Sequence, residues 1–243
     1  KYFYDLRAQP LETQFEHVIF SETEFNMNYL SIAERLSASE QYLKKFEAAF
    51  PNRNFAPSKF TITSAIASYV ASLQSFNSPV DQYINGTASL GETEKRGFNL
   101  FMGKATCGTC HFAPTFSGLV PPLYQESESE ILGVPATADN KALDQDLGRS
   151  ASVIKQSSEI YNHSFKTTTV RNVELTAPYM HNGVYKTLEE VVDFYNNGGG
   201  EGHGYAVPYQ TLPPDSLKLD SLEQHALIAF MRALTDTTGL SSP

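Results

Sequence analysis

The chain has 243 residues, and its formal net charge at pH 7 is −9. The lysine and arginine residues form no cluster in the sequence, so the charge pattern argues against nucleic acid as a partner. The length exceeds the commonest domain size and leaves room for one large domain or two small ones with substantial cores. No apolar run approaches the ~18 residues that a membrane-spanning helix requires.

The N-terminal part of the sequence predicts a series of helices. Two short amphipathic stretches cover residues 11–20 and 29–36, and a third, over residues 40–50, ends at Pro51. Apolar residues then recur at helical spacing and predict a longer, buried helix. Its expected buried stripe consists of Ile62, Ile66, Tyr69, Val70 and Leu73.

The middle of the sequence changes character after this helix. The tripeptide Asn77-Ser78-Pro79 breaks the helical pattern, and a turn at Asn85-Gly86 follows. Residues 92–102 predict another helix, which leads into Gly103. Residues 112–160 have little periodicity and are rich in proline, glycine, serine and aspartate, which predicts a long irregular loop.

The C-terminal part predicts two further helices. Thr187 and Glu190 fit a capping box, and the helix that they begin ends at Asn196-Asn197-Gly198. Residues 198–214 predict a loop, and the last helix begins near Asp220. Its expected buried stripe consists of Leu222, Ala226, Leu227, Phe230, Met231 and Leu234. With no internal repeat and no strand-rich region, the sequence predicts a mainly α fold.

Both cysteines of the sequence lie in the segment Cys107-Gly108-Thr109-Cys110-His111. The spacing C-x-x-C-H is the attachment signature of a c-type haem. The two thiols can form thioethers with the vinyl groups of the haem, and the imidazole of His111 can bind the iron as the proximal ligand. The segment therefore predicts one covalent haem, and the loop of residues 112–160 is expected to pass around it.

Two other chemistries use the C-x-x-C spacing. A structural zinc site needs about four nitrogen or sulfur ligands, and the sequence holds no second cysteine pair. A dithiol redox pair follows a strand in a compact βαβ unit, whereas the residues before Cys107 predict a helix. On the motif and its surroundings alone, haem is favoured over both alternatives, which stay open.

Several longer segments are similar to the bacterial di-haem cytochrome c peroxidases and their relative MauG. The most specific segment runs from Phe165-Lys166-Thr167 through Val170-Arg171-Asn172-Val173-Glu174-Leu175-Thr176 to Ala177-Pro178-Tyr179-Met180-His181-Asn182-Gly183. The further similar segments are Phe3-Tyr4-Asp5-Leu6-Arg7-Ala8, Leu11-Glu12-Thr13-Gln14, Asn77-Ser78-Pro79, Gly97-Phe98-Asn99-Leu100-Phe101 and Thr187-Leu188-Glu189-Glu190-Val191. Together they extend the resemblance over nearly the whole chain.

The resemblance implies a mainly α fold with two parts. Residues 79–243 are expected to form a class I cytochrome c-like domain with long irregular loops and one haem c. Residues 1–78 are expected to be a helical remainder of the N-terminal domain, which in the family holds the peroxidatic haem. Because the motif here matches the second, electron-transfer haem, we expect the first haem upstream of Lys1 and the chain to be part of a larger protein. Loss of the first haem is the alternative.

The resemblance also implies catalytic residues. Glu24 matches the family's distal glutamate, a general acid and base that assists cleavage of the peroxide O–O bond at the first haem. Gln14 matches a neighbouring polar residue of that pocket. Tyr4 takes the place of a tryptophan that in the family lies between the two haems. A tyrosine can still pass an electron between them, but its oxidation is coupled to loss of the phenolic proton. On its own, Glu24 would be interpreted as a solvated surface carboxylate.

Calcium is a second implied cofactor. Thr176 and the carbonyl oxygen of Pro178 match the family's interdomain calcium ligands, which suits an ion that prefers oxygen. The third protein ligand, an asparagine, is expected upstream. His181 belongs to the same motif, and we interpret it as a structural histidine or a neighbour of the ligands rather than a ligand. Structural or solvated roles are expected for His17, His163, His203 and His225.

The distal ligand of the haem iron separates two kinds of chemistry. Tyr195 stands where most of the family has a methionine ligand and where MauG has a tyrosine, so the resemblance implies that Tyr195 binds the iron. From its spacing alone, Tyr195 would be a core residue at the end of a helical stripe. Met180 is a competing thioether, although an aromatic residue is usual at its position. A thioether raises the reduction potential of the iron and a phenolate oxygen lowers it, so Tyr195 favours MauG-like chemistry.

The implied function is that of a haem c oxidoreductase. It would reduce hydrogen peroxide with electrons that a small cytochrome or cupredoxin passes through the C-terminal haem. The alternatives are MauG-like, peroxide-dependent oxidation of a partner protein and a plain electron-transfer cytochrome. Because haem c is attached outside the bacterial cytoplasm, the expected location is the periplasm, or an anchored position facing the periplasm or the cell surface. A homodimer is compatible with each of these functions.

Overall fold

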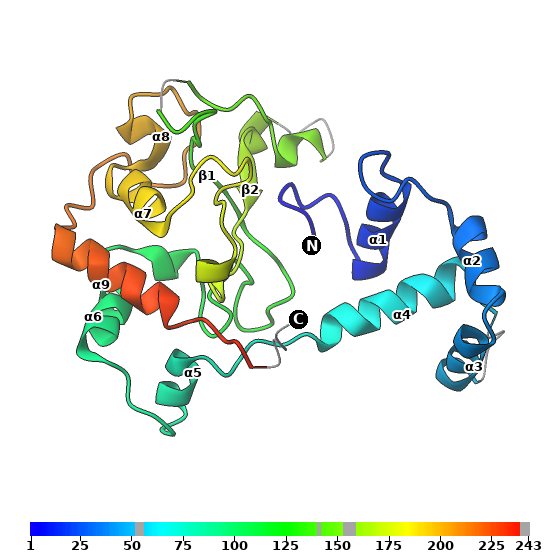
Figure 1. Ribbon diagram of the computed structural model, residues 1–243. Coiled ribbons are helices and arrows are strands. Elements are labelled where there is room, and N and C mark those ends of the chain that lie inside the picture. Colours follow the sequence, from blue (N-terminus) through cyan, green and yellow to red (C-terminus); the bar gives the residue numbers. More distant parts are fainter. Residues whose placement is uncertain (52–55, 140–141, 153–158, 239–243) are drawn as a thin grey trace. The chain divides into compact units, whose positions relative to one another are not determined.

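The computed structural model describes residues 1–51, 56–139, 142–152 and 159–238. The chain forms two compact units: one comprises Lys1–Phe3 and Ala8–Gln74, and the other comprises Tyr4–Arg7 and Ser75–Pro243. Helices make up most of the regular structure of each unit, as the sequence predicts (Figure 1). Within the described residues, no helix is both long enough and apolar enough to cross a membrane.

The first unit is built from α1 (Leu11–Phe20), α2 (Tyr29–Ser37), α3 (Glu40–Ala49) and α4 (Lys59–Ser72). Asn28 caps α2 by accepting a hydrogen bond from the Ser31 backbone N–H, and Ser58 begins α4 in a capping box with Thr61. The helices bury one apolar cluster, which consists of Ile19, Tyr29, Phe46 and Ile62. The predicted helices of this part of the chain are therefore confirmed.

The predicted burial of α4 is wrong along its second half. Tyr69 and Leu73 are 65% and 61% exposed, and Val70 is also exposed. The buried residues of α4 are Thr61, Ile62, Thr63 and Ala67. The apolar periodicity of the sequence thus extends beyond the part of the helix that the core of this unit covers.

The second unit contains α5 (Pro79–Ile84), α6 (Glu92–Met102), α7 (Leu188–Asn196), α8 (Gly199–Gly202) and α9 (Ser221–Arg232). The strands β1 (Ser129–Ile131) and β2 (Ser164–Lys166) pair antiparallel, with Glu130 opposite Phe165. Short 3-10 turns lie in the connections at Cys107–Thr109, Arg149–Ala151, Glu159–Tyr161 and Val173–Leu175.

The core of the second unit forms where α6 and α9 lie side by side (Figure 1). Gly97 lets the two backbones approach, because a Cβ atom at this position would lie 2.0 Å from the Ala226 carbonyl oxygen. Phe230, which is fully buried on α9, makes edge contacts with the rings of Phe101 and Phe116 at centroid distances of 5.2 and 5.7 Å. Since Phe101 and Phe116 flank the C-x-x-C-H segment in the sequence, this aromatic core supports the motif on both sides.

Replacing Gly97 by alanine is expected to lower the free energy of unfolding by about 1–3 kcal/mol, because the added methyl group forces α6 and α9 apart. The higher helix propensity of alanine opposes this loss by only ~1 kcal/mol. Urea unfolding measures the change. Arg96→Ala, at an exposed position of the same helix, is the control. A Gly97→Ala protein as stable as the wild type would contradict the close approach of the two helices.

Some elements of the second unit differ from the sequence prediction. Pro79 begins a helix instead of only ending one, because Ser78 caps α5 in a capping box with Asp81 and proline suits the first helical position. The predicted loop over residues 198–214 contains the short helix α8, and the irregular region of residues 112–160 contains β1.

The predicted buried stripe of α9 is correct except at its first residue. Leu222 is 65% exposed, whereas Ala226, Leu227, Phe230 and Met231 are buried. The buried positions of α9 run from Ala226 onward. The packed part of the helix therefore begins one turn after its N-terminus.

Candidate functional site

The second unit encloses a cavity of about 440 Å³, a size typical of sites for small ligands and cofactors. Apolar side chains from several elements form much of its wall, among them Phe101, Leu132, Val134, Val192, Leu227 and Met231. Cys107, Cys110, His111 and Tyr195 line the same cavity. The structure thus brings the four predicted haem-binding residues together at one site.

The local backbone presents the C-x-x-C-H segment to this cavity. α6 ends at Met102, and Thr106 adopts a φ of 55° before the 3-10 turn at Cys107–Thr109. The carbonyl oxygen of Cys107 accepts hydrogen bonds from the backbone N–H groups of Cys110 at 3.2 Å and of His111 at 2.9 Å. This tight turn holds both thiols and the imidazole at the cavity wall.

The imidazole of His111 is oriented by a backbone carbonyl. Its Nδ1 atom lies 3.3 Å from the carbonyl oxygen of Phe116. A protonated Nδ1 donates this hydrogen bond and leaves the lone pair of Nε2 available to a metal ion. Burial lowers the pKa of His111, so the side chain is held in the neutral form that binds metals.

The two cysteines are half-buried, and their thiols are poorly acidic. Burial raises the pKa of Cys107 to about 12, and burial together with the charge of Glu130 raises the pKa of Cys110 to about 11. A reactive dithiol pair needs the opposite, a thiol whose pKa is lowered. In the part of the chain that the structure describes, no group of three or more His, Cys, Asp or Glu side chains is placed to bind a metal ion. This geometry supports neither the dithiol nor the zinc interpretation of the cysteines.

Helix α7 places Tyr195 in the lining of the same cavity. The capping box fixes the start of the helix, since the Glu190 backbone N–H donates to Thr187 Oγ1 at 3.2 Å. Burial raises the pKa of Tyr195 well above its usual value, which keeps the phenol protonated in the chain without a bound cofactor. Met180, the competing thioether, lines the same cavity. Both candidate distal ligands therefore belong to one site.

Buried polar atoms without partners also belong to this cavity. Both ring nitrogens of His181 and the hydroxyl of Thr167 have no hydrogen-bond partner among the described residues, although His181 Nε2 lies 3.6 Å from Oδ2 of Asp144. The His181 side chain is 4% exposed, and its ring stacks on Phe165 with centroids 3.5 Å apart. Buried donors and acceptors normally have partners. A haem, which is a flat apolar ring with two carboxylate groups, would fill the apolar cavity and satisfy such atoms, so the residues present fit this cofactor.

Charged residues that the sequence analysis does not single out line the cavity as well. Glu130 on β1 and Lys166 on β2 are both part of its wall. Burial lowers the pKa of Lys166, and burial together with the charge of Glu130 raises the pKa of Glu128. Residues 126–130 alternate glutamate with serine, both polar, so they carry no apolar–polar strand pattern that identifies these carboxylates.

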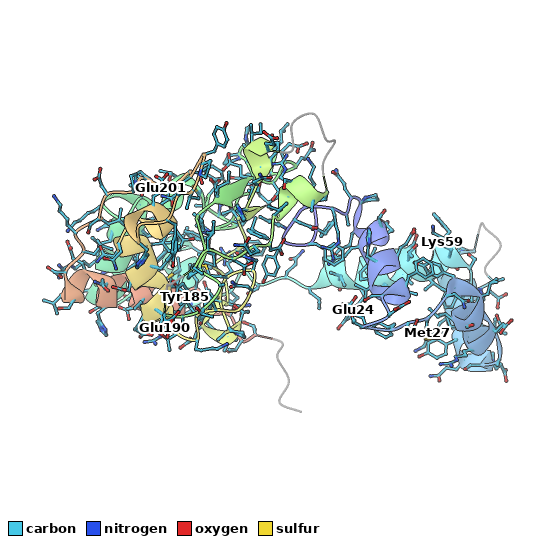
Figure 2. All side chains as sticks on the ribbon, turned by 90° about the horizontal axis from the view of Figure 1, so that it is seen from above. Glu24, Met27, Lys59, Tyr185, Glu190 and Glu201 are labelled. Atoms are coloured by element: carbon cyan, nitrogen blue, oxygen red, sulfur yellow. The ribbon has the colours of Figure 1, made fainter. Side chains whose placement is uncertain are left out.

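The other predicted site residues are divided between the two units. In the second unit, Tyr4 lines the cavity, and its carbonyl oxygen accepts a hydrogen bond from β2 at 2.6 Å. Thr176 and Pro178 are exposed and also line the cavity. In the first unit, Gln14 is half-buried on α1, and Glu24 is exposed in the turn that follows α1 (Figure 2).

Structural or solvated roles stay predictions for the remaining histidines, which differ in their surroundings. A backbone carbonyl oxygen lies within hydrogen-bond distance of His163. The rings of His17 and His203 each contact an aromatic ring, and His225 is exposed to solvent.

Comparison with known proteins adds an independent line of argument. A model of the family described as di-haem cytochrome c peroxidase matches residues 1–89. Cytochrome-c peroxidase IdrP1 of Pseudomonas sp. (strain SCT) is 37% identical, and the match covers 83% of this chain and 55% of that protein. Methylamine utilization protein MauG of Methylophilus methylotrophus is 31% identical, and the match covers 95% of this chain and 63% of that protein.

A solved structure extends the similarity to the fold. The crystal structure of a MauG-like protein associated with microbial copper homeostasis superposes with a TM-score of 0.77 at 29% identity, over 96% of this chain and 71% of that chain. The chain spans between 55% and 63% of the length of the curated relatives described here. The family model, the curated relatives and the solved structure all point the same way: the chain belongs to the family of the di-haem cytochrome c peroxidases and MauG, whose cofactor is haem c.

Proposed function

We propose that the second unit is a class I cytochrome c-like domain that binds one haem c. Cys107 and Cys110 would form the thioethers, and His111 and Tyr195 would bind the haem iron. The observation that carries this proposal is the convergence of the C-x-x-C-H turn, an imidazole anchored through Nδ1 and a half-buried tyrosine on one apolar cavity. Haem held there supplies reversible one-electron redox chemistry.

We further propose that the complete protein is a di-haem peroxidase, in which this domain passes electrons toward the reduction of hydrogen peroxide. The relatives are longer than this chain, so we assign the peroxide-reacting haem to sequence outside residues 1–243. Residues 1–78 then belong to the domain of that haem. A small cytochrome or cupredoxin is the proposed electron donor, and the periplasm or a surface facing it is the proposed location.

The chain's own residues have distinct proposed roles in this reaction. The carboxylate of Glu24 transfers a proton between the two peroxide oxygens, and Gln14 supplies a polar contact in the same pocket. Tyr4, at the cavity lining of the second unit, passes an electron with coupled loss of its phenolic proton. The Thr176 hydroxyl and the Pro178 carbonyl provide oxygen ligands for Ca²⁺.

Residues 1–243, produced in a periplasm with cytochrome c maturation, are expected to carry the added mass of one haem, and the double variant Cys107→Ala/Cys110→Ala none. The thioether bonds make the attachment resistant to denaturation, so intact-protein mass spectrometry after unfolding measures it. The matched control is Thr106→Ser/Thr109→Ser, which changes the same turn but keeps both thiols. Wild-type protein with no covalent haem, or with two, would refute the proposed site.

MauG-like oxidation of a partner protein is the second candidate function. The position of Tyr195 in the cavity lining favours it, since an oxygen ligand stabilises oxidised iron. The two functions differ in the fate of the oxidising equivalents. In a peroxidase, a reduced small cytochrome is oxidised in proportion to the peroxide consumed. In a MauG-like enzyme, the oxidation appears on side chains of a partner protein, and a plain electron-transfer cytochrome would consume no peroxide.

A further inference from the structure

We propose that the buried ion pair of Arg171 and Asp81 is a positioning device for His111, acting through the loop of residues 112–117. The inference rests on the proposed haem site, because it concerns how firmly the proximal ligand is held. Asp81 lies on α5 and Arg171 lies in the segment before α7, so neither belongs to the C-x-x-C-H turn. A continuous series of hydrogen bonds nevertheless links them to the imidazole.

The series begins at the imidazole itself. The carbonyl oxygen of Phe116 lies 3.3 Å from His111 Nδ1 and also accepts a hydrogen bond from the Val170 backbone N–H at 2.9 Å. Phe116 is 1% exposed and has a φ of 47°, an unfavourable conformation for a phenylalanine that its surroundings must maintain. The position of this carbonyl therefore depends on what holds the loop and Val170.

The loop is held by the segment that contains Val170. Thr169 Oγ1 donates to the Thr115 carbonyl at 2.6 Å. Arg171 donates to the Pro114 carbonyl twice, from Nε at 2.9 Å and from Nη2 at 2.7 Å. Three consecutive carbonyls of the loop, at 114, 115 and 116, thus accept hydrogen bonds from three consecutive residues of the other segment.

Asp81 fixes the guanidinium that makes these contacts. Arg171 Nη1 and Nη2 donate to the two carboxylate oxygens of Asp81 at 2.8 and 2.7 Å, the bidentate geometry that orients a guanidinium most firmly. Ser78 donates to the same carboxylate from its backbone N–H and its hydroxyl. The side chains of Arg171 and Asp81 are only 6% and 10% exposed. The pair is thus locked on both sides and isolated from solvent.

The hydrogen bonds that hold the loop determine how strongly basic Nε2 of His111 is. A firm hydrogen bond from Nδ1 to a carbonyl makes an imidazole a stronger donor at Nε2, which stabilises the oxidised metal. Loosening the loop weakens that bond and favours the reduced metal. A pair that only stabilised the fold would change unfolding but leave the redox equilibrium of the folded, haem-loaded protein unchanged.

The test uses residues 1–243 matured with haem, in the variants Asp81→Asn and Arg171→Lys. Asparagine keeps the shape of Asp81 but removes a negative charge, which by itself favours reduced iron because Arg171 lines the cavity. Lysine keeps the charge of Arg171 but cannot donate to Asp81 and Pro114 together as the planar guanidinium does, so Arg171→Lys separates the effect of the hydrogen bonds from that of the charge. At a fixed potential, we expect the ratio of reduced to oxidised haem to rise about tenfold, which corresponds to ~59 mV for a one-electron couple. Redox titration followed by absorption measures the ratio.

The matched control is Asp236→Asn. Asp236 is also a buried carboxylate, 6% exposed, and it accepts a hydrogen bond from the Asn77 backbone N–H, next to Ser78. We expect this change to lower stability but to leave the redox ratio at the wild-type value. Equal shifts in Asp236→Asn and Asp81→Asn, or no shift in Asp81→Asn and Arg171→Lys, would overturn the proposal.

A measurement on the wild type keeps the proposal testable if the variants fail to fold. The Nδ1 proton of His111 should exchange slowly with solvent in proton NMR of the reduced, haem-loaded protein, because its hydrogen bond is buried and fixed. Rapid exchange would contradict a firmly held imidazole. Failure of the haem site itself is distinguishable, because wild-type protein would then lack covalent haem in mass spectrometry before any titration is made.

Discussion

Replacing Tyr195 by phenylalanine is expected to change the ferric absorption spectrum and the spin state of the haem in residues 1–243. The change removes the oxygen that the proposed distal ligand presents to the cavity and keeps the ring that packs there. Because an anionic oxygen stabilises ferric iron, we also expect the reduction potential to rise by more than the ~59 mV that corresponds to a tenfold change in the equilibrium. Absorption and electron paramagnetic resonance spectra of the matured protein give the coordination, and redox titration gives the potential.

Two controls separate ligation from packing. Met180→Leu removes the competing thioether, and we expect it to leave the spectrum unchanged. Tyr185→Phe makes the same chemical change at a buried tyrosine whose ring contacts Phe194 at 5.6 Å (Figure 2). If Met180→Leu alone alters the iron coordination, Tyr195 is a core residue and the argument for MauG-like chemistry is lost.

Replacing Glu24 by glutamine is expected to slow peroxide turnover by about 10²-fold or more in protein that contains both haems. Glutamine has nearly the same shape as glutamate but cannot take up and return a proton, so binding of peroxide should change less than the rate. Steady-state oxidation of a reduced small cytochrome by peroxide measures kcat. Residues 1–243 alone are expected to show little turnover, because the peroxide-reacting haem is assigned to sequence outside them.

Glu22→Gln is the matched control for Glu24. Glu22 is an exposed carboxylate two residues away, in the same region after α1, and the substitution removes the same charge. We expect it to leave kcat near the wild-type value. Equal rates for the wild type and Glu24→Gln would show that Glu24 is a solvated surface residue. Fast turnover by residues 1–243 alone would contradict the assignment of peroxide reduction and electron transfer to two different haems.

The parts of the fold that could be predicted are those specified by neighbouring residues. α6 has the predicted bounds, and α7 and α9 begin at the predicted caps, Thr187 and Asp220, since capping and helical periodicity are local properties. α5 also has a local sequence signal: a serine cap, a proline at the first helical position and the aspartate that completes the capping box. This signal is missed when the proline is interpreted only as a helix breaker. Local chemistry is enough to define these elements.

The features that could not be predicted depend on contacts between distant residues. The short helix α8 packs so closely on the segment that follows β1 that a Cβ at Gly200 would lie 2.5 Å from the Gly133 carbonyl oxygen. The exposure of Leu73 and Leu222 depends on where a core ends, which apolar periodicity does not encode. For the site, the C-x-x-C-H motif identifies Cys107, Cys110 and His111, but Asp81 and Arg171 are far apart in the sequence, and only the folded chain reveals their pairing.

The acidity of the two thiols bears on the order in which this domain is assembled. Sulfur reacts as a nucleophile in its thiolate form, and a pKa of about 12 at Cys107 leaves very little thiolate once the chain has folded. In an unfolded chain the same thiol has an ordinary acidity and is accessible. If haem c is attached at this site as proposed, thioether formation is therefore expected before folding, on an extended segment around residue 107, and folding would afterwards enclose the attached cofactor. On this view, the maturation machinery handles an unfolded substrate, and the burial of the sulfur atoms protects a finished product.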